Sequence, residues 1–491
     1  MTQNARESFR TEHDAIGEIS LPPDCLYGIQ TARACANFPI SRRLVRPEFI
    51  RAIIMVKWAA VQAHAELSLL SEEKSSSLSR SCQCLIESSL FDETNPHEAR
   101  VFSAPVSGLT YSYSVLFPVD ALQGGAGTST HMNVNEVLAN LALIQMNHLP
   151  GEYAYLHPLD DVNLSQSTND VYPTALRIAS IYAVRKLSSS LSELQESLQR
   201  KEREYADIPK LGRTQLMDAV PITLGEEFGA YAQAIARDRW RIYKVEERLR
   251  QMNIGGTAVG TGTNANRKYP FVVTEKLQEI TGLGLARAEY PMDLTQNCDV
   301  FVEVSGLLKA CAVTLIKVSG DLRLMNSGPQ GGLGEISLEN RQVGSTIMAG
   351  KVNPVIAEAA GQTAMQVIAN DQAITLAAMS GQFELNAFLP LIADRLLDSL
   401  LILNNAISLF CRYAIDTLQP NRDACLSHLS ASTVQATLLV PEIGYEAAAR
   451  IRDIAESSGR PLYDVAKELS GLSPDILDKR LNPSTMILPN P

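Results

Sequence analysis

Two hydroxyls, one ammonium group and one amide stand close together in the glycine-containing segment 344–354. Ser345 and Thr346 supply the hydroxyls, Lys351 supplies the positive charge, and Asn353 supplies the amide. A lysine beside an amide suits a carboxylate, because both groups donate hydrogen bonds to its oxygens. Glycines before and within the segment permit hinge motion. The segment predicts a loop that closes over an anionic ligand. The plainer alternative is a surface loop that precedes a helix.

Two further polar segments precede predicted helices. In the first, Thr128 follows a run of glycines, and in the second Ser167, Thr168 and Asn169 stand together. Because the free N–H groups of a helix start favour an anion, hydroxyls and an amide at such a start form a carboxylate cradle. The alternatives are a phosphate-loop lookalike without its lysine for the first segment and simple N-capping for the second.

A fourth polar segment, 212–221, carries Thr214 and Gln215 beside prolines. Proline ends helices, which by itself explains a break here. If the four segments meet, their site is rich in hydroxyls and amides, poor in carboxylates and equipped with one lysine. No His, Cys, Asp or Glu group in the sequence has metal-ligand spacing. Such a site suits a dicarboxylate that is held without a metal or another cofactor.

Long helices are predicted to position these segments. Apolar residues repeat at alternating spacings of 3 and 4 over 184–198. The same repeat recurs over 228–252, where Asp238 occupies one position at which an apolar residue is expected. Segments 299–327 and 355–417 supply further helices. The first of these helices, expected from Pro173 to about Asp207, would be roughly 50 Å long. Helices of that length require partner helices, so we expect a bundle shared between subunits.

The remaining segments are less regular. Helical patterning covers 47–90, where the serine run 75–77 is expected to interrupt the helix. The stretch 94–117 has no clear period, and no role follows for it. Shorter helices with Gly and Pro breaks fill 425–491, which is expected to form a small domain of its own.

Composition limits the classes of partner. The chain has 491 residues, of which 45% are hydrophobic, so it can bury a large core. A net charge of −11 without a basic patch argues against nucleic acid and membrane partners. The N-terminal residues lack the apolar core of a secretory signal, so a cytoplasmic location is expected. The 8 scattered cysteines are expected to be reduced structural thiols.

Five segments resemble signatures of the aspartase/fumarase superfamily. They are 27–38 (YGxxTxRAxxNF), 125–137 (GxGTSTNMNxNEV), 165–170 (SQSxND), 212–219 (GRTQxxDA) and 344–353 (GSSxxPxKxN). The resemblance covers nearly the whole chain and is weakest at 90–118. This chain departs from the family's usual residues at six positions: His131, Asp161, Thr346, Ala349, Gly361 and Arg395.

The resemblance implies a mainly α, three-domain fold. Its parts would be an N-terminal, mostly helical domain (1–168), a central long-helix bundle that carries the 344–354 loop (169–424) and a small C-terminal helical domain (425–491). The bundle would form the core of a homotetramer with shared active sites. The resemblance also implies that Ser345 is the catalytic base. The substrate-binding residues that it implies are Thr128, Ser167, Thr168, Asn169, Thr214, Gln215, Thr346, Lys351 and Asn353.

Gln215 indicates which group leaves the substrate. Expulsion of hydroxide requires a general acid, and glutamine cannot supply a proton at neutral pH, whereas an α-ammonium already carries the proton with which it departs. Together with the resemblance, this predicts reversible elimination of ammonia from L-aspartate to give fumarate, through an aci-carboxylate intermediate and without a cofactor. Two alternatives stay open. One is a lyase of the same superfamily that acts on an N-substituted aspartate or nitrosuccinate, and the other is a non-catalytic structural relative.

Overall fold

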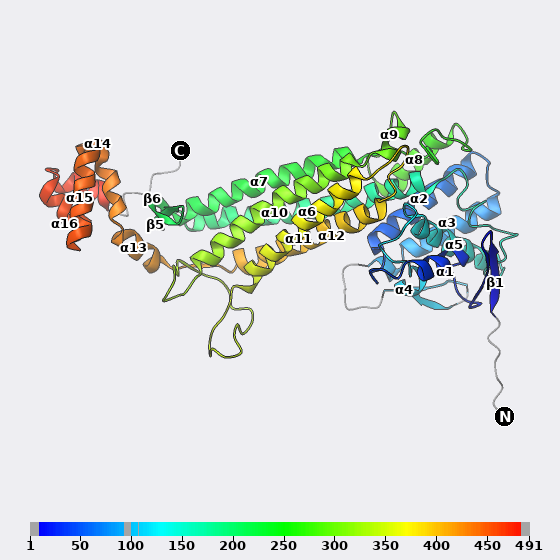
Figure 1. Cartoon of the computed structure of the whole chain (residues 1–491), viewed down its shortest axis with the longest axis horizontal. Coiled ribbons are helices and arrows are strands. Elements are labelled where there is room, and N and C mark those ends of the chain that lie inside the picture. The colour runs from blue at the N-terminus through cyan, green and yellow to red at the C-terminus, as the bar shows by residue number, and fades with distance from the viewer. Residues whose placement is uncertain (1–8, 93–99, 107, 483–491) are drawn as a thin grey trace, which may run out of the picture. The chain divides into compact units, whose positions relative to one another are not determined.

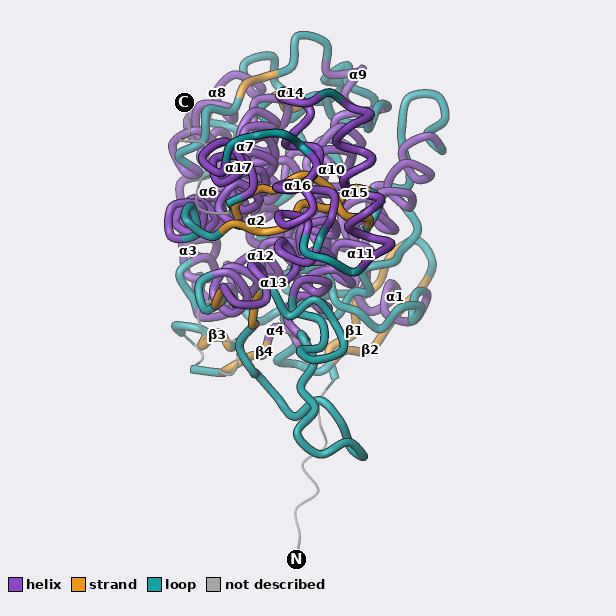
Figure 2. The backbone as a smooth tube through the Cα atoms, turned by 90° about the vertical axis from the view of Figure 1, so that its left-hand side faces the viewer, coloured by secondary structure: helices purple, strands orange, loops and turns teal. Residues whose placement is uncertain are grey.

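The computed structural model describes residues 9–92, 100–106 and 108–482. Helices account for 60% of the structure and strands for 9%, and Figure 2 shows the strands as short pairs among the helices. This confirms the predicted mainly α class. Among the described residues, no helix combines the length and the apolar character needed to cross a membrane.

The long helices are labelled in Figure 1. They are α2 (Pro47–Glu66), α6 (Thr168–Glu204), α7 (Leu224–Leu249), α10 (Asp299–Met325), α11 (Val355–Met379) and α12 (Leu389–Phe410). The shorter helices are α1 (Ile29–Asn37), α3 (Glu72–Ile86), α4 (Tyr113–Leu116), α5 (Thr128–Gln145), α8 (Tyr269–Thr281), α9 (Pro291–Gln296), α13 (Arg422–Ala431), α14 (Val440–Ile443), α15 (Tyr445–Ser458), α16 (Leu462–Leu469) and α17 (Pro474–Leu481). Two 3₁₀ helices, η1 (Ser89–Phe91) and η3 (Thr433–Leu439), and one π-helical turn, η2 (Cys411–Ile415), complete the helices of the described residues.

The strands form two-stranded sheets. The antiparallel pairs are β1 (Arg10–Asp14) with β2 (Gly17–Leu21), β3 (Val101–Ser103) with β4 (Thr110–Ser112), β5 (Pro209–Thr214) with β6 (Met217–Thr223), and β9 (Ile336–Ser337) with β10 (Gln419–Pro420). The parallel pair is β7 (Gln251–Met252) with β8 (Ala286–Arg287).

The chain divides into two compact units. The first unit contains Met1–Lys186, Ile242–Lys309 and Val367–Leu401, and the second contains Leu187–Arg241, Ala310–Gln366 and Ile402–Pro491. The limits of both units fall inside α6, α7, α10, α11 and α12. The expected three-domain division at residues 168 and 424 stays a prediction.

The predicted apolar seams are buried. In α6, Leu187, Leu191 and Leu198 are each fully buried, as the alternating spacing requires. Asp238, the polar residue in the apolar repeat of α7, is also buried, at 1% exposed. Its carboxylate lies 2.8 Å from the Nη1 atom of Arg241. The arginine offsets the cost of placing a carboxylate in that seam.

Within the second unit, segments of the long helices run side by side (Figure 1). The Oγ of Ser190 in α6 donates to Asn404 Oδ1 in α12 over 2.9 Å. The phenol of Tyr231 in α7 donates to Asp321 in α10 over 2.8 Å. These polar contacts link neighbouring helices at defined positions, so they help to fix the register in which the helices meet.

The predicted helix break at residues 75–77 is wrong. Ser75 and Ser77 lie inside α3 and are buried, and the chain breaks earlier, where Ser71 caps α3 by accepting from the N–H of Lys74. Ser75 donates its own hydroxyl to the carbonyl of Glu72 over 3.1 Å. Serines that bond back to helix carbonyls remain in a helix, so a serine run is a poor signal for a break.

The irregular stretch after α3 contains the β3–β4 hairpin and the short helix α4. The phenol of Tyr113, at the start of α4, donates to the carbonyl of Val45 over 2.7 Å and is buried. Residues 94–99 and 107 of the stretch without an assigned role lie outside the described residues. The described part therefore packs on the segment that leads into α2.

The last helices share an apolar core. Leu439, Ile451, Val465 and Leu477 come from η3, α15, α16 and α17 and are each at most 2% exposed. The cluster confirms the expected short helices, and Gly444 adopts a left-handed φ of 79° between two of them. All 8 cysteines are free thiols, as predicted.

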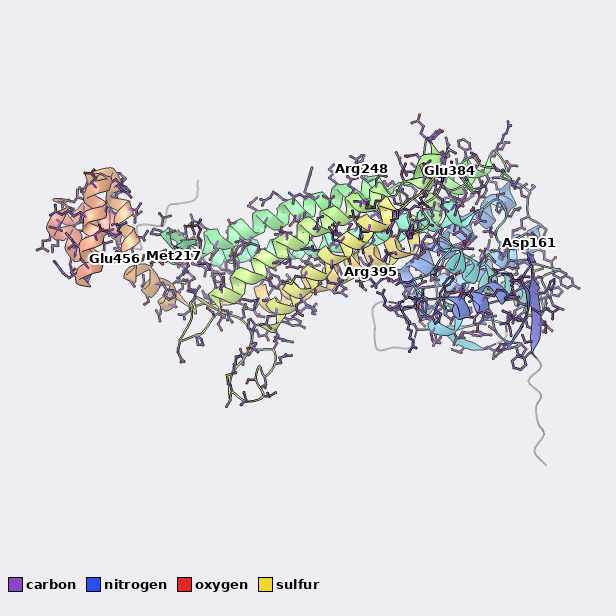
Figure 3. All side chains as sticks on the ribbon, viewed as in Figure 1. Asp161, Met217, Arg248, Glu384, Arg395 and Glu456 are labelled. Carbon is purple, nitrogen blue, oxygen red and sulfur yellow. The ribbon has the colours of Figure 1, made fainter. Side chains whose placement is uncertain are left out.

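The turn of the β5–β6 hairpin contains two residues in a strained, left-handed backbone conformation. Thr214 pairs with Met217, so Gln215 and Leu216 form a two-residue turn, and their φ angles are 55° and 63°. Turns with two left-handed residues favour glycine and asparagine. Figure 3 labels Met217 at this hairpin, and Leu216 is 75% exposed.

We predict that Leu216→Gly stabilises the protein by about 0.5–1 kcal/mol. Removal of the Cβ relieves the left-handed strain of about 1–2 kcal/mol, and the added freedom of glycine in the unfolded chain offsets part of this gain. Calorimetry would report the gain as a higher midpoint temperature of thermal unfolding. The control is Leu426→Gly, an exposed leucine in α13, which should lower the midpoint. A lower midpoint for Leu216→Gly would contradict the strain argument.

Candidate active site

The N-termini of α5 and α6 meet in the first unit. The first helix begins at Thr128, after Gly127 with a φ of 94°. A Cβ on Gly127 would lie 2.3 Å from a ring carbon of Tyr172 in α6, so glycine is required for this approach. The Nδ1 atom of His131 lies 2.8 Å from Oγ1 of Thr168, the first residue of α6. Two positive helix ends therefore lie close together, an arrangement that attracts an anion.

Reciprocal capping starts α6. Ser167 Oγ accepts from the N–H of Asn169 over 3.2 Å, and Asp170 Oδ1 accepts from the N–H of Ser167 over 2.9 Å. The other oxygen of Asp170 accepts from the N–H groups of Gly255 and Thr257, at 3.0 and 2.9 Å. The capping interpretation is confirmed. The same carboxylate also attaches the loop after β7 to the helix start.

Pro173 has a positional role near the start of α6. Proline has no N–H, so the helix leaves the carbonyl of Asn169 without its usual partner four residues later. Asn253 supplies one, because its Nδ2 donates to that carbonyl over 2.9 Å. In return, the Nδ2 of Asn169 donates to the carbonyl of Ala258 over 2.7 Å. The loop after β7 is thus held against α6 from both sides.

The glycine-rich segment 260–265 (GTGTNA), whose spacing imitates a dinucleotide fingerprint, belongs to this loop. Gly260 has a φ of 88°, and a Cβ there would lie 2.3 Å from the Cα of Met292. Gly260 therefore serves the close packing of two backbones, and the described residues around it form no βαβ unit.

A buried lysine lies behind the α6 start. Lys57, in the middle of α2, donates its ammonium protons to Asn163 Oδ1 and Gln166 Oε1, both at 2.9 Å. Burial lowers the pKa of Lys57 well below its usual value. Burial also raises the pKa of Asp170, to about 7, against the opposing effects of its backbone N–H donors and of Lys57. The sequence analysis missed this residue, although a lysine inside the apolar run of α2 is an available signal.

The catalytic serine predicted from the sequence lies in a loop of the second unit. Ser345 Oγ accepts from the backbone N–H groups of Ile347 and Met348, at 3.2 and 2.8 Å. Both donors would stabilise negative charge on that oxygen. The loop is exposed at Thr346, and Ile347 is 88% exposed.

Backbone contacts close the base of this loop. The N–H of Gly344 donates to the carbonyl of Lys351 over 2.9 Å, and Asn353 Nδ2 donates to the carbonyl of Gly344 over 2.8 Å. A Cβ on Gly344 would lie 2.7 Å from the nitrogen of Asn353, so this glycine permits close approach. Within 344–354 the left-handed φ belongs to Gly350, at 77°. Gly344 and Gly350 therefore have different roles in this loop.

Lys351 and Asn353 line a cavity of about 740 Å³ in the second unit. The side chains of Arg323 and Glu358 and the amide of Asn421 contribute to the same lining. Lys351 and Arg323 thus bring positive charge to this lining, and Glu358 brings one negative charge.

A buried carboxylate joins the β5–β6 hairpin to the segment before the loop. Glu335 Oε2 lies 2.8 Å from Lys210 Nζ, and its Oε1 lies 2.8 Å from Arg213 Nη1 and 3.1 Å from His428 Nδ1. Arg213 directly precedes Thr214, one of the predicted ligand residues. Burial raises the pKa of Glu335, but Lys210, Arg213 and His428 outweigh this effect and hold it below its usual value.

Two departures from the family pattern, Asp161 and Arg395, are labelled in Figure 3. Asp161, in the loop before α6, receives the ammonium of Lys74 on both oxygens at 2.8 Å. Arg395 lies 2.6 Å from Asp394 and donates to Asn370 Oδ1 over 3.2 Å. Both side chains are occupied in local pairs of the first unit.

The predicted site residues fall into two groups. Thr128, Ser167, Thr168 and Asn169 lie together in the first unit, at the adjoining starts of α5 and α6. The second unit carries Thr214, Gln215, Ser345, Thr346, Lys351 and Asn353. Convergence of the two groups in one pocket stays a prediction.

A mainly helical fold with anion-attracting helix starts and a serine, lysine and asparagine loop defines a class of enzyme, and comparison with known proteins gives the family. Residues 107–369 match the lyase family, and residues 436–488 match the fumarase C C-terminus. Aspartate ammonia-lyase of Pseudomonas fluorescens is 43% identical over 485 residues, which cover 98% of this chain and 97% of the relative. The Bacillus subtilis (strain 168) enzyme of the same name is 40% identical and covers 99% and 98%.

Solved structures agree with this result. A fumarate lyase:delta crystallin from Brucella melitensis superimposes with a TM-score of 0.90 at 41% identity, covering 98% of this chain and 100% of that one. A class II fumarase from Schistosoma mansoni gives a TM-score of 0.88 at 29% identity, covering 99% and 100%. The chain belongs to the aspartase/fumarase superfamily and to its aspartate ammonia-lyase branch, and it is a carbon–nitrogen lyase. The family resemblance seen in the sequence is confirmed.

We predict that Glu335→Gln destabilises the protein by about 1.5–3 kcal/mol at neutral pH, because Lys210 keeps the carboxylate of Glu227 at 2.7 Å but loses its second one, and Arg213 loses the carboxylate of Glu335. The folded-state pKa of Glu335 is lowered, so the carboxylate's contribution is complete above its usual pKa of 4.5 and is lost as the pH falls through the lowered value. The difference in unfolding midpoint between the variant and the wild type should therefore shrink in acid.

Calorimetry from about pH 3 to about pH 7.5 measures this difference. The control is Glu468→Gln, which removes the exposed ion pair with Arg460 and should cost less than about 1 kcal/mol. Equal midpoints for Glu335→Gln and Glu468→Gln at neutral pH would refute the role of the buried network.

Proposed function

We propose that this protein catalyses the reversible elimination of ammonia from L-aspartate to give fumarate. The observation that carries the proposal is the environment of Ser345, whose Oγ faces two backbone N–H groups in a loop closed by Gly344, Lys351 and Asn353. Serine is a poor base at neutral pH unless its alkoxide is stabilised. The N–H groups of Ile347 and Met348 provide part of that stabilisation, and we assign the rest to Lys351 of the same loop.

The proposed chemistry begins with proton removal. The Ser345 alkoxide takes a proton from C3 of aspartate, next to the β-carboxylate, and the electron pair of the C–H bond moves onto that carboxylate to form the aci-carboxylate. Its collapse forms the C2–C3 double bond and breaks the C2–N bond, so nitrogen leaves as ammonia. The proton taken by Ser345 then passes to the released ammonia, which becomes ammonium, and the alkoxide is restored. Hydroxyls and N–H groups aimed at the developing charge each contribute about 3–4 kcal/mol to such a step. The residues cast in this role are Thr128, Ser167, Thr168 and Thr346.

The remaining residues orient the substrate. Lys351 and Asn353 bind the α-carboxylate, in line with their place on the cavity beside the loop. Because Asn169 uses Nδ2 for the carbonyl of Ala258, its Oδ1 is the atom offered to the substrate ammonium. Thr128 completes the amine site.

The residues of the β5–β6 turn favour an amine as the leaving group. Thr214 and Gln215 contact the ligand from this turn, and neither side chain can protonate a departing hydroxide at neutral pH. The aspartate ammonia-lyases at 40–43% identity support the same choice of amine. No cofactor takes part in the proposed steps.

The proposed assembly is a cytoplasmic homotetramer whose active sites are shared between subunits. Apolar side chains on the long helices of the second unit support an assembly, because Trp240, Val313, Met365 and Leu409 are 63, 55, 59 and 48% exposed in the single chain. Exposed apolar side chains on several helices of one bundle mark a protein interface.

A substituted succinate is the second candidate substrate. A ring at His131 beside Thr168 changes the wall of the proposed carboxylate site, and this contact favours a departure from aspartate. Parallel assays with aspartate, malate, N-substituted aspartates and nitrosuccinate distinguish the candidates. Turnover of aspartate alone would dismiss the second one.

We predict that Ser345→Ala lowers kcat for fumarate formation by roughly 10³-fold, the range expected when a general base is lost. Ultraviolet absorbance of fumarate released from L-aspartate measures the rate. Ser457→Ala, which removes an exposed hydroxyl in α15, is the matched control and should retain full activity. Full activity of Ser345→Ala would remove Ser345 as the base.

We also predict complementation between two inactive variants. If Ser345 and Thr168 of one site come from different subunits, tetramers assembled from Ser345→Ala and Thr168→Ala chains contain some intact sites. Random mixing should restore about a quarter of the wild-type activity. The control mixes each variant with itself. Failure of the mixed tetramer to recover activity would show that both residues serve a site from the same chain.

A further inference from the structure

His131 is a buried histidine that the proposed chemistry does not yet use. It lies one turn into α5, is 1% exposed, and its Nδ1 is 2.8 Å from Thr168 Oγ1. Its other ring nitrogen, Nε2, is buried and has no hydrogen-bond partner among the described residues. Nδ1 of the ring thus contacts a proposed substrate-binding residue, and Nε2 makes no hydrogen bond within the described part of the chain.

The ring is neutral at the pH of the reaction. Burial lowers the pKa of His131 well below its usual value, and the positive charge of Lys57 lowers it further. A neutral imidazole carries one hydrogen, on either Nδ1 or Nε2. The tautomer therefore decides the direction of the hydrogen bond with Thr168.

The two tautomers have different costs. With hydrogen on Nε2, the protein would bury an N–H donor without a partner, and Thr168 would spend its only proton on Nδ1. With hydrogen on Nδ1, only a lone pair on Nε2 lacks a partner. Buried N–H groups without partners are rarer in proteins than under-satisfied acceptors, so the Nδ1–H form is favoured.

This tautomer gives Thr168 a defined polarity. Its Oγ1 accepts from His131, so its own proton is free to point away from the ring. The hydroxyl sits at the start of α6, beside the start of α5, where an anion is attracted. A donor fixed in that position meets the charge that develops on a carboxylate.

We propose that His131 is a positioning residue that donates from Nδ1 to Thr168 and thereby holds the threonine hydroxyl as a hydrogen-bond donor to the reacting carboxylate of the substrate. The inference rests on the proposed function, because it requires Thr168 to contact the substrate. A donor that matters mainly for the developing charge affects kcat more than KM.

Three variants separate this role from a structural one. His131→Phe keeps a ring of similar size without nitrogen, His131→Asn keeps an N–H donor, and Thr168→Val removes the partner hydroxyl. We expect His131→Phe to lower kcat roughly 10- to 100-fold with little change in KM, and His131→Asn to recover most of the loss. In a Thr168→Val background, His131→Phe should have no further effect on kcat.

A spectroscopic measurement tests the tautomer without activity. Magic-angle-spinning NMR of the intact protein with ¹⁵N-labelled histidine resolves protonated from unprotonated ring nitrogens, and the signal missing from His131→Asn identifies His131 among the 7 histidines. We expect a neutral ring with hydrogen on Nδ1. Hydrogen on Nε2, or a kcat loss for His131→Phe that persists in the Thr168→Val background, would overturn the inference.

Failure of the proposed function looks different. It appears in the wild type, which would then release no fumarate from aspartate. In that case the same kinetic comparison is made with whichever substituted succinate is turned over. If the wild type turns over none of them, the kinetic role of His131 falls with the proposed function. An active wild type with the wrong tautomer rejects the His131 inference alone.

Discussion

The carboxylate of Asp170 is the interaction on which the first half of the candidate site depends. It accepts three backbone N–H groups, one from the residue that caps α6 and two from the loop after β7. Buried carboxylates are costly unless such donors compensate them. With Lys57 holding the preceding turn through two amides, the α6 start becomes rigid. Rigidity matters because a ligand cradle made of short hydroxyl side chains works only when the backbone places them accurately.

The second unit also contains a buried carboxylate that fixes the position of a predicted ligand-binding segment. Glu335 contacts Lys210 and Arg213 of β5 and His428 of α13, so it fixes the hairpin that carries Thr214 against α13. The serine loop itself is closed by backbone contacts of Gly344, and its tip stays exposed. A loop that closes over a ligand needs a fixed base and a tip that can move, and the serine loop has a closed base and an exposed tip.

Much of this organisation was predictable from the sequence. Period and spacing gave the helices α6, α7 and α10 within a few residues, because a buried helical face imposes a regular apolar repeat. Hydroxyl and amide clusters marked the starts of α5 and α6, because helix starts need side-chain or ligand partners for their free N–H groups. The serine run in α3 was misjudged, since local preference cannot show that a hydroxyl bonds back to its own helix.

The sequence by itself determined the helical class, the superfamily and the residue types that can bind a carboxylate, because these depend on local periodicity and on short motifs. Only the tertiary structure decided that α5 and α6 begin beside each other, that Pro173 leaves a carbonyl for Asn253, and that His131 lies against Thr168. These contacts join residues that are distant in the chain. Their geometry follows from the packing of whole helices, which no local pattern of residues encodes.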